Sequence, residues 1–313
     1  ALQELNIDAP VVDFSGLQSG KQLVRAELRN IHAVNLTGFQ NSERLEGLKI
    51  KRAKNLKDLD GLTRATALKS VSLDDCPALT NVAALKNSAK LECFEYSFYS
   101  WSEQAALASL SGLENATGLQ SIKLKGCMVK DLDPIRSRAT FVCIKLQDLP
   151  KLQSIAGLSS AAAFKNPEQS GFIDNRVQIE NCPMLKCLDG LGPGDGGAGR
   201  LSKLSLNKVG VEGLSALGGQ TLDAILIDNC AKLQSLEGLH TKQSEISIQK
   251  CAVLTDIAAL GACFSLKSID LTESGALQDL SPLMDLTGLE QLITRKCNRL
   301  KPKPKTLIMD TVV

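Results

Sequence analysis

The chain has 313 residues, of which 43% are hydrophobic and 4% aromatic, and its formal net charge is +2. The apolar fraction is enough for a large core, which must be built mainly from Leu, Ile, Val and Ala because aromatic residues are scarce. So small a net charge excludes a strongly basic field of the kind that grips a nucleic-acid backbone. No run of residues approaches the roughly 18 to 20 apolar positions that span a bilayer, so we expect no membrane span.

The chain begins at Ala1, with no initiator Met and no leader in which an apolar stretch follows positive charges. We therefore expect either that a targeting segment has been removed or that the sequence is an excised piece.

A short repeat runs through the sequence. Residues 68–85 match residues 222–239 position for position, with apolar residues or Cys at the same seven places. The centre of each repeat is an apolar-x-apolar pair, and nine of the twelve spacings between successive pairs are 21 to 23 residues. Thirteen such pairs occur: Leu5/Ile7, Ala26/Leu28, Leu48/Ile50, Val71/Leu73, Phe94/Tyr96, Ile122/Leu124, Ile144/Leu146, Val177/Ile179, Leu204/Leu206, Ile225/Ile227, Ile246/Ile248, Ile269/Leu271 and Leu292/Thr294.

Two periodicities define the conformation of each repeat. The central pair has period two, which predicts a short strand with one buried face. Apolar residues then recur at every third position, which favours 3₁₀ or extended turns. Because a single coil cannot bury its own apolar edges, the thirteen coils should stack into one long parallel sheet.

The pattern L-x-x-L-x-L-x-x-C/N-x-x-L-x-x-L-x-G-L resembles the leucine-rich repeat over essentially the whole chain. Its period and its L-x-G-L ending, as at 59–62 and 236–239, are similar to the short-repeat class of bacterial internalins and phosphatase-regulator repeats. The resemblance implies an α/β solenoid, a curved right-handed superhelix with its sheet on the concave face and 3₁₀ or irregular turns on the convex face. It implies one domain over 1–313, with repeats at 1–300 and a C-terminal capping segment at 301–313.

The pattern of the ten cysteines does not indicate a disulfide framework. Six of them occupy one repeat position, where the family usually has Asn: Cys76, Cys127, Cys182, Cys230, Cys251 and Cys297. We expect them to be structural and mostly reduced, which favours an intracellular reducing compartment such as the cytoplasm. Cys93 and Cys143 should face outward on their strands. A secreted, surface or organellar location after removal of a leader is the alternative. His32 and His240 have no zinc-type spacing, so no metal site is expected.

Aromatic residues gather in the fifth coil, whose spacing is stretched to 28 residues. Phe94 and Tyr96 hold buried strand positions. Phe98, Tyr99 and Trp101 leave the strand, and they either form an exposed binding hot spot or close a small satellite core. Both readings remain open at this stage.

Charged residues should line one face of neighbouring strands. Alternation places Lys49, Lys51, Glu95, Lys123, Lys125 and Lys145 there. This mixed-charge face suits a protein better than a nucleic acid.

Two longer spacings predict loop insertions, at Ser159–Asn175 and Gly192–Gly199. The second contains G-x-G-x-x-G, but it lacks the preceding strand and following helix of a dinucleotide site, so it is interpreted as an insertion.

We expect a scaffold that binds a protein partner on the concave face over coils three to seven, through Phe98, Tyr99, Trp101, Glu95 and the five lysines named above. No catalytic residue, cofactor, small-molecule substrate or nucleic acid is expected. Two alternatives remain open, a structural subunit that docks through its insertions and an internalin-like secreted or surface adhesion protein.

Overall fold

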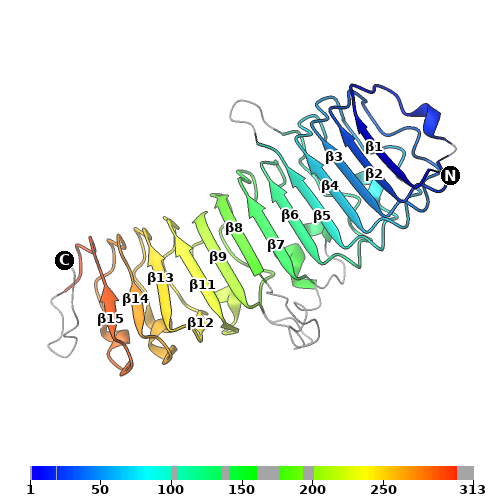
Figure 1. Cartoon of the computed structure of the whole chain (residues 1–313). Coiled ribbons are helices and arrows are strands. Elements are labelled where there is room, and N and C mark those ends of the chain that lie inside the picture. Colours follow the sequence, from blue (N-terminus) through cyan, green and yellow to red (C-terminus); the bar gives the residue numbers. More distant parts are fainter. Residues whose placement is uncertain are drawn as a thin grey trace. The chain divides into compact units, whose positions relative to one another are not determined.

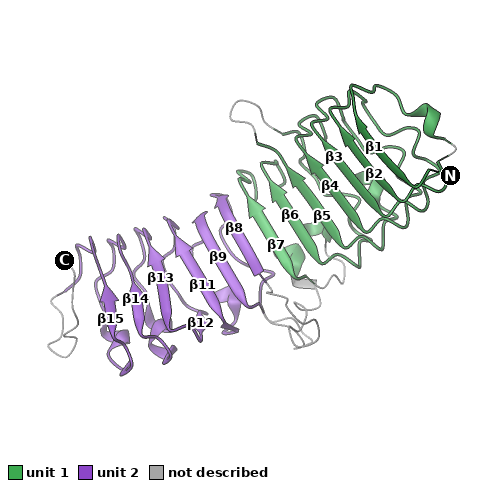
Figure 2. Cartoon of the chain, viewed as in Figure 1, with its two compact units in different colours: residues 1–162 green, residues 163–313 purple. Residues whose placement is uncertain are grey.

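A computed structural model of the chain describes residues 2–18, 20–99, 105–135, 141–160, 176–192 and 201–301. The chain divides into two compact units, residues 1–162 and 163–313 (Figure 2). The division falls inside the insertion predicted at Ser159–Asn175.

Unit 1 is a stack of short parallel strands. Each strand pairs in register with the next one along the chain (Figure 1), so equivalent repeat positions form straight rows across the sheet. The strands are β1 (Glu4–Asp8), β2 (Arg25–Arg29), β3 (Gly47–Lys51), β4 (Ser70–Asp74), β5 (Cys93–Ser97), β6 (Ser121–Lys125) and β7 (Cys143–Gln147). The return segments contain the 3₁₀ helices η1 (Ser15–Leu17), η2 (Ala83–Leu85), η3 (Asp133–Ile135) and η4 (Ala156–Ser160).

Unit 2 repeats this architecture. Its main strands are β8 (Arg176–Cys182), β9 (Lys203–Val209), β11 (Ala224–Asp228), β13 (Glu245–Gln249), β14 (Ser268–Asp270) and β15 (Gln291–Ile293), and they also pair in parallel. A two-stranded sheet joins β10 (Thr221–Leu222) to β12 (His240–Thr241), and the 3₁₀ helices are η6 (Ser215–Leu217), η7 (Ala258–Ala262) and η8 (Ser281–Leu283).

The strand prediction is confirmed, because each of the thirteen apolar-x-apolar pairs begins inside a strand. The β-solenoid has about 11 turns, so thirteen was a slight overcount of the coils. A strand at the end of a stack completes no turn by itself. Parallel pairing and 3₁₀ return segments are as predicted.

The core lies between each sheet and its return segments. Inward strand residues such as Leu28, Val71 and Ile227 are at most 1% exposed. Leu5 and Ile7 in β1 are only half-buried, because the strand lies at the end of the stack and is covered from one side only. This agrees with the stacking argument, in which each coil relies on its neighbours to bury its edges.

The six cysteines that occupy the family's Asn position in the repeat, which we call the ladder cysteines, are all buried. They lie where the chain bends at the end of each strand. Their thiols approach backbone carbonyls, as where Sγ of Cys297 lies 3.1 Å from O of Leu271. Burial raises the pKa of Cys76, Cys127 and Cys251 to about 12 and that of Cys230 to about 11. These thiols are therefore neutral, which supports the structural role predicted for them.

The glycine of the L-x-G-L ending has a specific cause. Gly61 and Gly238 have φ of 112° and 86°, in the region that side chains rarely adopt. A Cβ at Gly61 would also strike the carbonyl oxygen of Leu36 in the preceding coil. Only glycine allows the coils to approach this closely.

Candidate interaction surface

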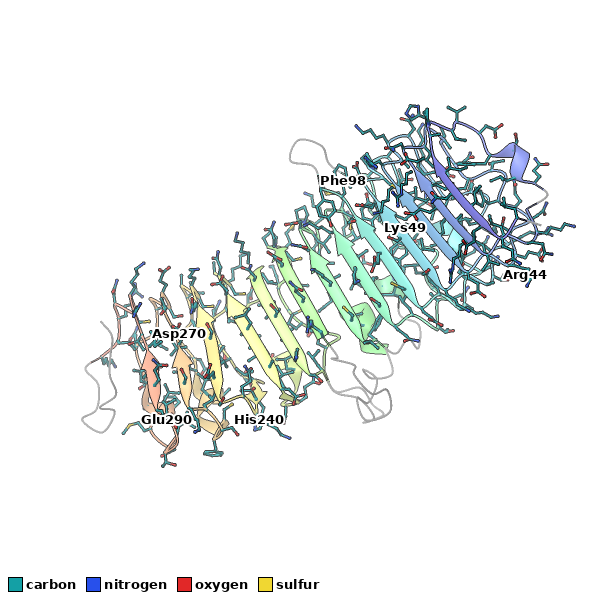
Figure 3. All side chains as sticks on the ribbon, in the orientation of Figure 1. Arg44, Lys49, Phe98, His240, Asp270 and Glu290 are labelled. Carbon is teal, nitrogen blue, oxygen red and sulfur yellow. The ribbon has the colours of Figure 1, made fainter. Side chains whose placement is uncertain are left out.

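The outward strand residues of unit 1 form three rows, which we call the unit 1 sheet face. The alternation predicted from the sequence is confirmed, since Lys49, Lys51, Lys123, Lys125 and Lys145 are all outward and exposed or half-buried. Strand pairing places the middle row in the order Asn6, Glu27, Lys49, Ser72, Glu95, Lys123 and Lys145. Figure 3 shows Lys49 in this setting.

Two ion pairs cross neighbouring strands within that row. Nζ of Lys49 lies 3.4 Å from Oε1 of Glu27, and Nζ of Lys123 lies 2.5 Å from Oε1 of Glu95. The hydrogen bond from Lys123 to Glu95 raises the pKa of the lysine. Exposed pairs of this kind contribute at most about 1 kcal/mol each, so their main effect is to orient the side chains.

Lys145 extends the row beyond the second pair. It lies directly opposite Lys123 on the neighbouring strand, and like charges in that position repel. Among the residues that the structure describes, Lys145 has no ion-pair partner. The end of the row therefore carries a positive charge that no described residue of unit 1 pairs with.

A hollow of about 150 Å³ lies over β5, β6 and β7. It brings together five of the predicted binding residues: Glu95, Tyr99, Lys123, Lys125 and Lys145. Tyr99 is 64% exposed, and Nζ of Lys125 lies 4.4 Å from the centre of its ring. The same Nζ is 3.8 Å from Oδ2 of Asp148, so the cation is held from two sides. An exposed aromatic ring bordered by fixed cations is suited to contact a partner.

The structure divides the remaining predicted residues. Lys49 borders a separate hollow of about 410 Å³ over β1 to β4 and is not part of the Tyr99 hollow. Lys51 lies on β3 and lines neither hollow. Trp101 is outside the described residues, as are most of the two predicted insertions.

The prediction that Phe98 belongs to an exposed rim is wrong. The side chain is 5% exposed, while its backbone N–H donates to O of Lys125 at 3.1 Å. The sequence held the signal, because Phe94, Tyr96 and Phe98 follow one another at intervals of two and continue the buried face of the strand. Phe94 and Tyr96 are core, as predicted, and Oη of Tyr96 donates to the carbonyl oxygen of Cys76 at 3.2 Å.

Cys93 and Cys143 face outward in the first row, on either side of Ser121. Both are half-buried, and burial raises the pKa of the Cys93 thiol. Their predicted orientation is confirmed.

A hollow on unit 2 was not predicted from the sequence. It measures about 640 Å³ and surrounds Leu226, an outward strand residue that is 48% exposed. The signal was the run Ala224-Ile225-Leu226-Ile227, in which apolar residues fill the outward positions as well as the inward ones.

Within the described ranges, no three His, Cys, Asp or Glu side chains gather closely enough to hold a metal ion. No helix in the part of the chain that the structure describes is long and apolar enough to cross a bilayer.

Comparison with known proteins identifies the fold. No protein-family model and no curated protein sequence matches the chain. An internalin from Listeria monocytogenes, internalin F, aligns with a TM-score of 0.58 and 17% identity over 99% of this chain and 79% of the internalin. The chain has a leucine-rich repeat fold. It resembles internalins, as the repeat pattern predicted.

Other leucine-rich repeat structures align less closely. The repeat domain of the type III effector XopL gives a TM-score of 0.45 at 16% identity, over 89% of this chain and 80% of that domain. The ectodomain of a receptor kinase from Arabidopsis thaliana, solved with Casparian strip integrity factor 2, gives 0.37 at 14% identity over 95% of this chain and 45% of that one.

Proposed function

We propose that this leucine-rich repeat chain is a protein-interaction scaffold that holds its partner on the unit 1 sheet face, over β3 to β7. The observation that carries the proposal is the hollow in which Tyr99 stands among Lys123, Lys125 and Lys145. Function in repeat folds resides in the side chains that the scaffold displays, and this hollow gathers most of those predicted from the sequence.

The chemistry of the hollow defines what the partner presents there. Tyr99 offers a large ring that loses little conformational freedom on binding, and Lys125 already fixes one side of it. Lys145 supplies a cation that an acidic side chain of the partner can neutralise. Glu95 keeps Lys123 in place and disfavours a uniformly acidic surface. The best-matched partner surface therefore combines one acidic group with an apolar or aromatic one.

Trp101 and Lys49 have different roles in the same proposal. Trp101 follows Tyr99 closely in sequence and remains a candidate anchor. Lys49, two strands from Glu95, and Lys51 beside it would set the register of a longer partner that extends toward β3.

Affinity capture with matched variants tests the proposal. The wild-type chain, the double variant Tyr99→Ala plus Lys145→Glu, and the control Lys86→Glu are each used to capture proteins from native lysate. Lys86 follows η2 in a return segment, away from the sheet. A partner retained by wild type and control but lost by the double variant supports the sheet face. Equal capture by all three chains contradicts it.

A second candidate, an internalin-like adhesion protein, is favoured by the similarity to internalin F. We infer a reducing compartment instead, because Cys187 is exposed and Cys93 and Cys143 are only half-buried. The two candidates are separated by counting free thiols in the chain after it has been expressed in its native host and then denatured. Ten free thiols support the intracellular scaffold, and several disulfides support the adhesion protein.

A further inference from the structure

We draw no further inference here: the strongest candidate, the apolar end of unit 1 at which Leu5 and Ile7 of β1 are half-buried and Leu2 and Val12 are exposed, carries nothing because no described residue shows what covers it.

Discussion

The two units share one repeat but fill it with different side chains. The described part of unit 1 buries six aromatic residues: Phe14, Phe39, Phe94, Tyr96, Phe98 and Phe141. The buried apolar residues in the described part of unit 2 are Leu, Ile, Val and Cys, and Phe264 is 72% exposed. Four of the six ladder cysteines also belong to unit 2. The repeat therefore fixes which positions point inward, while the volume of each coil interior is set coil by coil.

The sheet faces differ in the same way. On unit 1, opposite charges on neighbouring strands form pairs such as Glu95–Lys123. On unit 2, the cations Arg176 and Lys203 are separated from Glu245 by the apolar residues Ala224 and Leu226. Because most charges on the unit 1 sheet face are paired, its specificity for a partner should come from the few groups outside those pairs, here Tyr99 and Lys145.

The largest expected effect comes from the difference in the cores. Phe94→Ala in β5 removes a fully buried ring and should lower the free energy of unfolding by about 3–5 kcal/mol. Phe264→Ala in unit 2 should change it by less than about 0.5 kcal/mol because the ring is in solvent. Urea unfolding followed by circular dichroism measures both. Equal losses would show that the two rings are not in the environments described.

A smaller effect is expected at Tyr96. Tyr96→Phe keeps the ring but removes one of the two hydrogen bonds that the carbonyl oxygen of Cys76 accepts, the other coming from Leu79 N–H, so it should cost about 0.5–1.5 kcal/mol. Urea unfolding is again the measurement. Leu73→Ile, a nearby core change that removes no polar group, serves as the control and should cost less than about 1.5 kcal/mol.

A substitution at the ladder position is expected to raise the free energy of unfolding. Ser274 holds the ladder position of its coil, and its buried hydroxyl has no hydrogen-bond partner among the described residues. Ser274→Cys replaces the hydroxyl with the thiol used in other coils, so the free energy of unfolding should rise by about 1 kcal/mol. A decrease would mean that the hydroxyl is satisfied in solution and that thiol and hydroxyl are not interchangeable there.

The smallest effect concerns acid stability in unit 2. The hydrogen bond from Ser235 lowers the pKa of Asp256. A carboxyl with a depressed folded-state pKa stabilises the fold above its unfolded value of about 3.9, and this contribution is lost as the pH falls through the folded value. Asp256→Asn should therefore reduce the loss of unfolding free energy at acidic pH by roughly a few tenths of a kcal/mol. The effect is small because the side chain is mostly exposed. An unchanged loss in urea titrations between pH 5 and 2 would contradict this assignment.

The fold was largely predictable because it depends on periodicity. Pairs such as Val71/Leu73 and Ile225/Ile227 mark strands, and the spacing between pairs fixes the parallel pairing and the rows of the sheet. The outward positions of Lys49, Glu95 and Lys123 follow from the same alternation. Curvature and coil count depend on details of the return segments that the apolar pattern does not encode.

The candidate site was predictable only in part. Alternation found the lysines but was not extended to Phe98, which obeys it and is buried. The hollow around Leu226 depends on the small size of Ser205 and Ser247 on neighbouring strands, and these residues are about 21 positions away from Leu226 in sequence. Such a combination becomes visible only when the pairing register is known.

Site-specific photo-cross-linking tests the central claim, that a partner occupies the unit 1 sheet face. A photoreactive amino acid is placed at Lys145, and in a separate chain at Lys86 in the return segment, and both chains are illuminated in native lysate. We expect a discrete cross-linked product from position 145 and none from position 86, with loss of the first product when Tyr99→Ala is added. A product from position 86 alone would contradict it.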